Sequence, residues 1–426
     1  MFGSKSYRIP SLLTALNGTI LAGIDQRIPG SEDSPNEIKI AIRRSLDGGE
    51  TWEPIQVAAS YPGTGPDAPS VIDSALLQDP ATGTLFLIFD HFPGGYGYPQ
   101  AQQGTGFAPD GHKLLFDADN HRFMLGPNGE VFDSSGALAS YKVLPNGDVY
   151  NGETYSGNIY FKAGTLPESL HVLGTSYLQI IESQDDGLTW SEPRDLNFQV
   201  KADWMKFMGT GPGNGIVINE GPYIGRLVFP VYFTNSCGMQ SSAVIYSDDH
   251  GVTWHRGESP NDGRNWGGKT LDSMTMDVWP AQLTEAAVVQ LRNGVLQLYM
   301  RNTSDRKRVA VATSFDGGTT WENDVAFADA LLEPYCQLTA ITYPDPGDGK
   351  ERVLFANPSN ADSRVNGTVR LSEDGGKTWS YSRTIAPGSY WYSSLTVLPD
   401  KRIGLLYEGE GGNILFTAFN LEWIKS

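Results

Sequence analysis

The sequence predicts an all-β protein: a six-bladed β-propeller with a small β-rich insertion in its second blade. An eight-residue pattern occurs five times, each copy follows a run with strand character, and the later copies are about one four-stranded blade apart. The composition agrees, since 49 of the 426 residues are glycine and the chain contains 19 Tyr and 10 Trp. Such a composition favours many short strands joined by tight turns over a helical bundle.

The repeated pattern has the form Ser-x-Asp-x-Gly-x-Thr-Trp. Its copies occupy residues 45–52, 183–190, 247–254, 314–321 and 372–379. The runs that precede them, residues 38–44, 176–182, 242–246, 308–313 and 367–371, alternate in hydrophobicity or are rich in β-branched residues. A strand pattern that runs into an Asp/Gly cluster indicates a strand entering a hairpin turn.

The chemistry of the pattern is that of a stabilised turn. The Asp carboxylate can accept hydrogen bonds from turn amides, and the Gly can adopt a positive φ without strain. The Trp supplies a large apolar body that fixes the turn to a neighbouring strand. Calcium binding is the functional alternative, but each loop offers too few oxygen ligands for that ion. We therefore interpret the pattern, called the Asp box below, as structural.

The spacing of the boxes predicts the domain organisation. Successive copies start 138, 64, 67 and 58 residues apart, so the first interval has an excess of about 75 residues over one blade. We assign the excess to an insertion over residues 94–169, which leaves 1–93 and 170–426 for the propeller. The alternative is two full blades, one of which has lost its box. Strand-like runs near 390–398, 402–407 and 414–419 predict most of a sixth blade.

Charge and hydrophobicity exclude two classes of partner. The chain has 31 Lys and Arg against 49 Asp and Glu, a net charge of −18, which is unfavourable for binding nucleic acid. No apolar run reaches the roughly 18 residues of a membrane span.

The first six residues contain no apolar signal region. We expect a secreted or cell-surface protein whose signal segment is removed, and a cytoplasmic protein is the alternative.

Cysteines and histidines give little sign of a metal or disulfide framework. The two cysteines, Cys237 and Cys336, are too few for a disulfide framework or a four-cysteine metal cluster. We expect two free, buried thiols, and one disulfide bridge is the alternative. The six histidines, among them His250 and His255, show no metal-ligand spacing, so we expect surface or structural roles for them.

Several segments together resemble the sialidases, or neuraminidases, a family that also carries Asp boxes. Tyr7-Arg8-Ile9-Pro10 is similar to the family's Phe/Tyr-Arg-Ile-Pro signature. The segments GIDQR (23–27), VKADWMKF (200–207), LTEAAVVQL (283–291) and LYMR (298–301) resemble the large bacterial members that have a β-rich insertion. The resemblance reaches residue 419 or so. It implies an exo-α-sialidase that releases terminal sialic acid from sialylated glycoconjugates.

The resemblance implies three arginines that bind the substrate carboxylate: Arg8, Arg301 and Arg364. The physical reason is clear, because the anomeric carbon of sialic acid carries a carboxylate that is ionised at neutral pH. A guanidinium stays charged and pairs with a carboxylate through two parallel hydrogen bonds.

The nucleophile implied by the resemblance is Tyr392, with Glu285 as its base. A carboxylate nucleophile would be repelled by the substrate's own charge, which a phenol avoids. Reaching the phenolate from a pKa near 10 costs roughly 4 kcal/mol at pH 7, so a neighbouring base must take the proton. Tyr390 is the alternative nucleophile.

The acid that protonates the departing oxygen corresponds to Asp33, with Glu32 and Asp25 as alternatives. The resemblance further implies substrate-binding roles for several positions. Arg27 matches a residue near the 4-hydroxyl, Tyr232 and Gln240 match the glycerol side, and Ile72 and Asp73 match the side of the N-acetyl group. The implied mechanism retains configuration through a covalent tyrosyl-sialyl intermediate and requires no metal or organic cofactor.

Other activities remain open at this point. Some relatives are intramolecular trans-sialidases, in which a Trp covers the site; the corresponding run here, YEGEGGNI (407–414), has no Trp, which favours hydrolysis. A propeller that only binds glycans is a second alternative. A glycosidase with two carboxylates that acts on neutral polysaccharides is a third, and it would not need the arginines. We expect the insertion to shape the aglycone side of the cleft.

Overall fold

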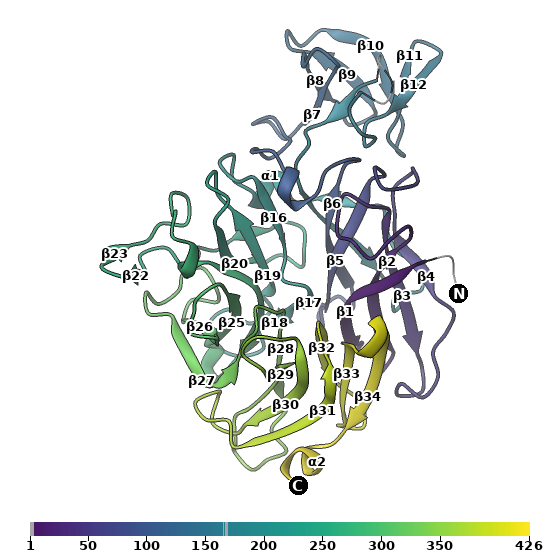
Figure 1. The fold of residues 1–426 in the computed structure, drawn as a ribbon. Coiled ribbons are helices and arrows are strands. Elements are labelled where there is room, and N and C mark those ends of the chain that lie inside the picture. Colours follow the sequence, from purple (N-terminus) through teal and green to yellow (C-terminus); the bar gives the residue numbers. More distant parts are fainter. Residues whose placement is uncertain (1–3, 165, 167–168) are drawn as a thin grey trace.

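The computed structural model describes residues 4–164, 166 and 169–426, and it confirms an all-β, six-bladed propeller with an inserted β-rich unit in the second blade. Six antiparallel sheets are arranged in a ring (Figure 1). Our predictions for the first six residues and for the insertion include positions 1–3, 165, 167 and 168, which lie outside the described residues.

Five blades have four main strands and the sixth has three. Blade one consists of β1 (Ser6–Thr14), β2 (Ile20–Arg27), β3 (Ile38–Ser45) and β4 (Gln56–Ala59). Blade two consists of β5 (Ser70–Gln78), β6 (Leu85–Phe92), β14 (Tyr177–Ser183) and β15 (Arg194–Asp195), and β17 (Gly213–Asn214) pairs with β5 in parallel. Blade three consists of β16 (Phe207–Thr210), β19 (Leu227–Thr234), β20 (Gln240–Ser247) and β21 (His255–Arg256), and β18 (Ile216–Val217) pairs with β19.

The remaining blades follow the same order. Blade four consists of β24 (Leu283–Gln290), β25 (Leu296–Asn302), β26 (Arg308–Ser314) and β27 (Ala326–Leu332). Blade five consists of β28 (Thr339–Tyr343), β29 (Arg352–Pro358), β30 (Val365–Ser372) and β31 (Tyr381–Ser389), and blade six of β32 (Ser393–Val397), β33 (Ile403–Glu408) and β34 (Ile414–Phe419). Apart from the inserted strands treated below, the described residues outside the blades form the short helices α1 (Asn197–Val200) and α2 (Leu421–Lys425), four 3-10 turns and the hairpin β22 (Asn265–Trp266) and β23 (Lys269–Thr270).

The core lies between neighbouring blades. Phe86 of blade two, for example, packs in one buried cluster with Phe229 and Trp254 of blade three. The ring closes where blade six meets blade one. There the backbone N–H of Leu12 in β1 donates to Ser394 Oγ in β32 at 3.0 Å, and Ile9 N–H donates to Glu408 Oε1 at 2.7 Å. Buried apolar area and these hydrogen bonds hold the first and last blades together.

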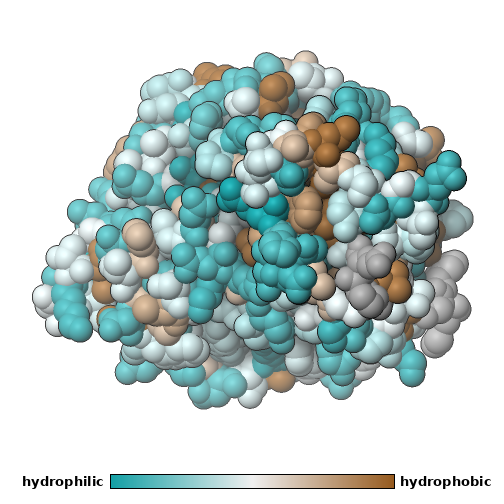
Figure 2. All heavy atoms as spheres, turned by 90° about the horizontal axis from the view of Figure 1, so that it is seen from above, coloured by the Kyte–Doolittle hydropathy of each residue, from teal (hydrophilic) through white to brown (hydrophobic). Residues whose placement is uncertain are grey.

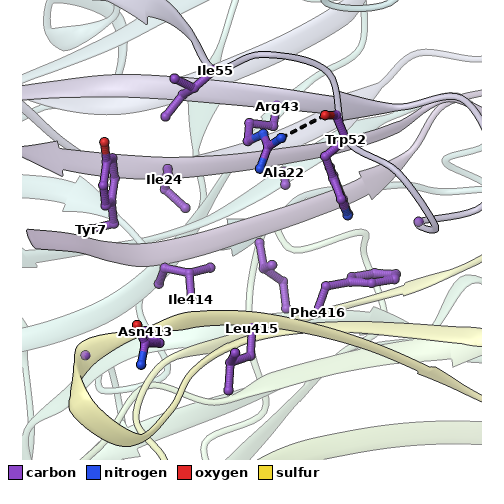
Figure 3. A pocket seen from close by; sticks show the side chains of 13 residues that line it. Tyr7, Ala22, Ile24, Arg43, Trp52, Ile55, Asn413, Ile414, Leu415 and Phe416 are labelled. Atoms are coloured by element: carbon purple, nitrogen blue, oxygen red, sulfur yellow. Dashed lines mark hydrogen bonds between the residues drawn. The ribbon is translucent and has the colours of Figure 1, made fainter. Parts of the chain in front are cut away.

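A groove of about 510 Å³ runs along this junction, between blade one and the edge strand β34 (Figure 3). Trp52 packs edge-on against Phe416 across it, with ring centroids 5.3 Å apart. Its walls also include Tyr7 and Ile24 from blade one and Ile414 from blade six (Figure 3). No predicted site residue lines this groove, so it is separate from the cavity described below.

The insertion forms a seven-stranded sheet between β6 and β14, at the top of Figure 1. Its strands are β7 (Lys113–Phe116), β8 (Arg122–Leu125), β9 (Glu130–Asp133), β10 (Leu138–Val143), β11 (Asp148–Asn151), β12 (Thr154–Asn158) and β13 (His171–Val172). It has its own buried cluster around Leu115, Val131 and Val149. The exact bounds of the insertion, 94 and 169, stay a prediction.

The surface of the molecule, seen from above, is mostly hydrophilic, with hydrophobic residues in small patches (Figure 2).

The Asp boxes form turns at the ends of the third strands of the first five blades. In the first box, Asp47 accepts hydrogen bonds from Ser45 Oγ and Thr51 N at 2.8 and 2.9 Å, and Gly49 N donates to Ser45 Oγ at 2.9 Å. The other four boxes repeat these bonds, and the Thr hydroxyl in each donates to the Asp carboxylate. The carboxylates are therefore engaged in the turn itself, as the structural interpretation requires.

The cysteines correct one expectation. Cys237 and Cys336 are both free, but only Cys336 is buried, whereas Cys237 is exposed in the turn that joins β19 and β20. The hairpin turn places Cys237 at the surface because residues at its tip have no strand to pack against. In the described part of the chain, no helix has the length and apolar character needed to cross a membrane.

Candidate active site

The predicted site residues meet at one end of the ring. In each blade the first strand begins, the second strand ends and the third strand begins at this end, so residues at those places converge. They surround a cavity of about 420 Å³. All predicted residues except Arg27 line it: Arg8, Asp33, Ile72, Asp73, Tyr232, Gln240, Glu285, Arg301, Arg364 and Tyr392.

Tyr392, Glu285 and Arg301 form a directly hydrogen-bonded group. The phenol of Tyr392, just before β32, donates to Glu285 Oε1 in β24 at 2.5 Å. Arg301, in β25, donates from Nη1 to Glu285 Oε2 at 2.5 Å and to the Tyr392 oxygen at 3.0 Å. Glu285 is therefore placed to receive the phenol proton, and Arg301 is placed to stabilise negative charge on the phenol oxygen.

Burial decides the resting protonation state of Tyr392. Burial raises the pKa of the Tyr392 phenol well above 10, the negative charge of Glu285 raises it further, and Arg301 opposes both. The phenol is therefore neutral at physiological pH and acts as a hydrogen-bond donor.

Arg8 and Arg364 also lie near the Tyr392 ring. Their guanidinium carbons are 5.5 and 5.7 Å from the centroid of that ring. Both also lie over the ring of Trp391, at 5.2 and 4.7 Å, and this indole is partly exposed. With Arg301, three guanidinium groups from blades one, four and five surround one phenol, an arrangement suited to binding an anion beside it.

Arg8 and Arg364 are each held by an acceptor. Arg8 donates from Nε and Nη2 to Glu408 Oε2, both at 3.3 Å, and Arg364 donates from Nη2 to the Tyr335 carbonyl at 2.9 Å. Glu408, at the end of β33, is 5% exposed, so the Arg8 pairing is protected from solvent. These contacts fix the direction of the guanidinium groups.

Asp33 and Arg27 occupy different environments. Asp33 lies in the loop after β2 with 71% of its side chain exposed, and it pairs with Arg27 Nη1 at 2.6 Å. The Arg27 side chain is fully buried and also pairs with Asp25 at 3.0 Å. Arg27 thus lies behind Asp33 and does not line the cavity. The exposed position of Asp33 at the mouth gives its carboxyl access to a leaving group and to water.

The alternative residues for these roles do not line the cavity. Tyr390 is fully buried between blades five and six, where its ring stacks on Tyr407 with centroids 5.1 Å apart. Asp25 is fully buried against Arg27, and Glu32 is exposed outside the cavity wall. Among these candidates, the geometry favours Tyr392 as nucleophile and Asp33 as acid.

The rest of the cavity wall combines apolar and polar groups. Ile72 and Asp73, at a break in the register of β5, form one part of it. Tyr232 packs against Phe207 with centroids 5.0 Å apart, and Gln240 donates from Nε2 to the Tyr98 hydroxyl at 2.6 Å. Tyr98 belongs to the predicted insertion, so part of the insertion reaches the cavity, although its seven-stranded sheet does not line it.

Several cavity or support residues were not predicted from the sequence, among them Tyr98, Tyr335, Asp90 and Glu408. Asp90 and Glu408 could have been proposed from their positions in the sequence, because both stand near the end of a second strand, as Arg301 does. Tyr335 and Tyr98 lie in loops, for which strand position offers no guide. Among the described residues, no group of three or more His, Cys, Asp or Glu side chains is arranged to hold a metal ion.

Comparison with known proteins agrees with this geometry. Residues 159–407, more than half of the chain, match the family model of a BNR repeat-like domain. The chain is 30% identical to an anhydrosialidase of Macrobdella decora over 95% of its own length and 58% of that protein. It is also 30% identical to a sialidase of Micromonospora viridifaciens, over 99% of its own length and 52% of that protein. The chain thus spans little more than half of these relatives.

A solved structure extends the likeness to the fold. The intramolecular trans-sialidase from Ruminococcus gnavus, in complex with oseltamivir carboxylate, superposes with a TM-score of 0.83 at 28% identity. The match covers all of this chain and 96% of that one. Together with the Asp boxes, the arginine cluster and the paired Tyr392 and Glu285, these matches show that the chain belongs to the sialidase family.

Proposed function

We propose that this protein is an exo-α-sialidase, a glycoside hydrolase that releases terminal sialic acid from sialylated glycoconjugates. The observation that carries the proposal is the placement of Arg8, Arg301 and Arg364 around the hydrogen-bonded phenol of Tyr392. A cation cluster beside a neutral nucleophile suits a substrate with a carboxylate on its reacting carbon.

The proposed reaction proceeds in two steps with retention of configuration. The three arginines bind the carboxylate, the Tyr392 oxygen forms a bond to the anomeric carbon, and its proton passes to Glu285. The bond to the aglycone breaks as the Asp33 carboxyl protonates the departing oxygen. Water then attacks the tyrosyl-linked sugar, Asp33 takes a proton from that water, and Tyr392 leaves and regains its own proton from Glu285.

Electrostatics supports the attack by Tyr392, the first step of this sequence. Glu285 and Arg301 already contact the phenol oxygen, so little reorganisation is needed as charge shifts from phenol to carboxylate. Asp33 pairs with Arg27 and must be protonated before it can act as an acid.

Intramolecular transfer is a second candidate function, because two of the similar proteins are named for it. In that reaction the sugar's own 7-hydroxyl attacks the intermediate in place of water. We favour hydrolysis, because residues 407–414 contain no Trp. The aromatic group that covers Arg8 and Arg364 is Trp391, which directly precedes the proposed nucleophile.

The test is turnover of 3′-sialyllactose followed by mass analysis of the product. Hydrolysis predicts free sialic acid, whereas intramolecular transfer predicts an anhydro sugar one water lighter. Absence of any released sugar, with a folded protein, would contradict both functions and would favour a propeller that only binds glycans.

A further inference from the structure

Asp73 has an unusual backbone conformation at the cavity wall. Its φ is +63°, in the left-handed region, and the pairing of β5 with β6 shifts register between Ile72 and Ala75. A non-glycine residue in this region is strained and persists only where its surroundings hold it. The backbone polar groups on either side of Asp73 show what holds it.

Two contacts bind the Asp73 backbone from opposite sides. Its N–H donates to Asp25 Oδ1 at 3.0 Å, and its carbonyl accepts a short hydrogen bond from the Thr210 hydroxyl. Thr210 is fixed in turn by Asp90, whose Oδ1 accepts the Thr210 backbone N–H at 3.0 Å. Asp25 and Asp90 are both fully buried. Blades one and three therefore hold the strained residue of blade two between them.

Asp90 has a second feature that sets it apart. It lines the cavity, and its other oxygen, Oδ2, has no hydrogen-bond partner among the described residues. Gly209 leaves room for this carboxyl, because a Cβ at that position would stand 2.0 Å from Oδ2. A buried carboxylate with one unsatisfied oxygen costs far more than a neutral carboxyl at the same place.

We propose that Asp90 is a positioning residue that acts through Thr210 to hold Asp73 against the substrate, and that it does so as a neutral carboxyl. The inference rests on the proposed function, since it concerns how the same cavity accepts an anionic sugar. An ionised Asp90 would add negative charge to the cavity wall and would repel the carboxylate that the arginines bind.

The surroundings of Asp90 favour the neutral form. Burial raises the pKa of Asp90 well above its usual range, the Thr210 amide opposes this, and the charges of Asp25 and Glu285 add to it. Asp73 and Tyr232 also interact electrostatically with Asp90, and the positive charge of buried Lys201 opposes the rise in its pKa. Because the pKa is raised, the neutral form persists to higher pH than in a solvent-exposed aspartate and is lost as the pH rises through the folded-state value.

The experiment compares Asp90→Asn with Asp90→Leu in the full chain, using a fluorogenic sialoside over a range of pH. Asn keeps an acceptor for Thr210 and supplies an N–H donor, so we expect a KM within about twofold of wild type at pH 7. Leu removes the acceptor, so we expect KM to rise tenfold or more while kcat changes less. We also expect the wild-type KM to rise at alkaline pH and this rise to be absent in Asp90→Asn.

One further variant tests the same inference at Thr210, and another serves as a control. Thr210→Val removes the hydroxyl that binds the Asp73 carbonyl and should raise KM in the same way, even if Asp90→Leu fails to fold. Asp79→Asn changes a buried carboxyl at the far end of blade two and should leave KM unchanged. An unchanged KM in both Asp90→Leu and Thr210→Val, or equal damage from Asn and Leu at Asp90, would overturn the inference. A wild-type protein that releases no sialic acid would instead contradict the proposed function.

Discussion

The two ends of the propeller use aspartates in opposite ways. At the Asp-box end, Asp47 is exposed, and hydrogen bonds from the Thr51 hydroxyl and amide lower its pKa to about 2. At the cavity end, burial raises the pKa of Asp25 to about 7, although Arg27 opposes this shift. Aspartate therefore stabilises turns where hydrogen-bond donors surround its carboxylate, and its pKa is shifted upward where burial excludes solvent. The predictions below separate these two uses.

The largest effect should come from Tyr392→Phe, at the cavity end. Removal of the phenol oxygen leaves no atom to attack the anomeric carbon, so we expect kcat to fall at least about 10³-fold. Turnover of the fluorogenic sialoside measures this, and the melting temperature serves as the control for folding. Tyr390→Phe is the matched variant and should retain activity, because Tyr390 does not line the cavity. Equal activity in wild type and Tyr392→Phe would refute the tyrosyl mechanism.

Arg301→Lys should have the next largest effect. The substitution keeps the positive charge but loses the planar fork that contacts both Glu285 and Tyr392. We expect kcat/KM to fall by roughly 30- to 160-fold, equivalent to about 2–3 kcal/mol of transition-state stabilisation. A glycosidase for neutral polysaccharides would tolerate this change, so a harmless Arg301→Lys would point to that activity.

Asp33→Asn should show an effect that depends on the leaving group. A sugar alcohol needs protonation as it departs, whereas an activated phenol does not. We therefore expect about a 10²-fold loss on 3′-sialyllactose and a loss below tenfold on the fluorogenic aryl sialoside for the glycosylation step. Single-turnover rates on the two substrates check this. Similar losses on both would assign the acid role to another residue.

The smallest effect should come from Asp47→Asn, at the Asp-box end. Because the folded-state pKa is lowered, the carboxylate contributes stability above its unfolded value near 3.8, and this stability is lost as the pH falls toward 2. We expect the melting temperature of the variant to be lower than that of wild type at pH 7 and the difference to shrink at pH 3. KM should not change. The exposed Asp329→Asn variant is the control, and a pH-independent difference would contradict the proposed origin of the stability.

The fold was predictable because its signal is local and repeated. Each box follows its own strand, so the five copies marked five blades, and the runs after Trp379 supplied the three strands of the sixth. Most of the cavity was predictable for a different reason. Arg8, Glu285 and Tyr392 stand at or near the starts of inner strands, and family resemblance supplied roles that strand patterns alone do not encode.

The supporting contacts of the cavity could not be predicted, because they join different blades and one sequence does not display contacts between blades. Asp90 stands near a strand end, as Arg301 does, but its sequence position does not reveal the hydrogen bond from Thr210, which is 120 residues away. Glu408 is likewise linked to Arg8 over a separation of 400 residues. Arg27 carries a matching motif, yet its pairing with Asp25 and Asp33 places it behind the wall. The chain's exposed thiol, Cys237, shows that a cysteine can lie at a turn rather than in the core.

The central claim is that three guanidinium groups bind the sugar carboxylate beside the Tyr392 phenol. A crystal structure of the protein soaked with a 2,3-dehydrated sialic acid analogue tests it most directly. The account predicts that the ligand carboxylate contacts Arg8, Arg301 and Arg364, with its anomeric carbon next to the Tyr392 oxygen. A carboxylate bound away from these arginines, or an anomeric carbon out of reach of Tyr392, would contradict the account.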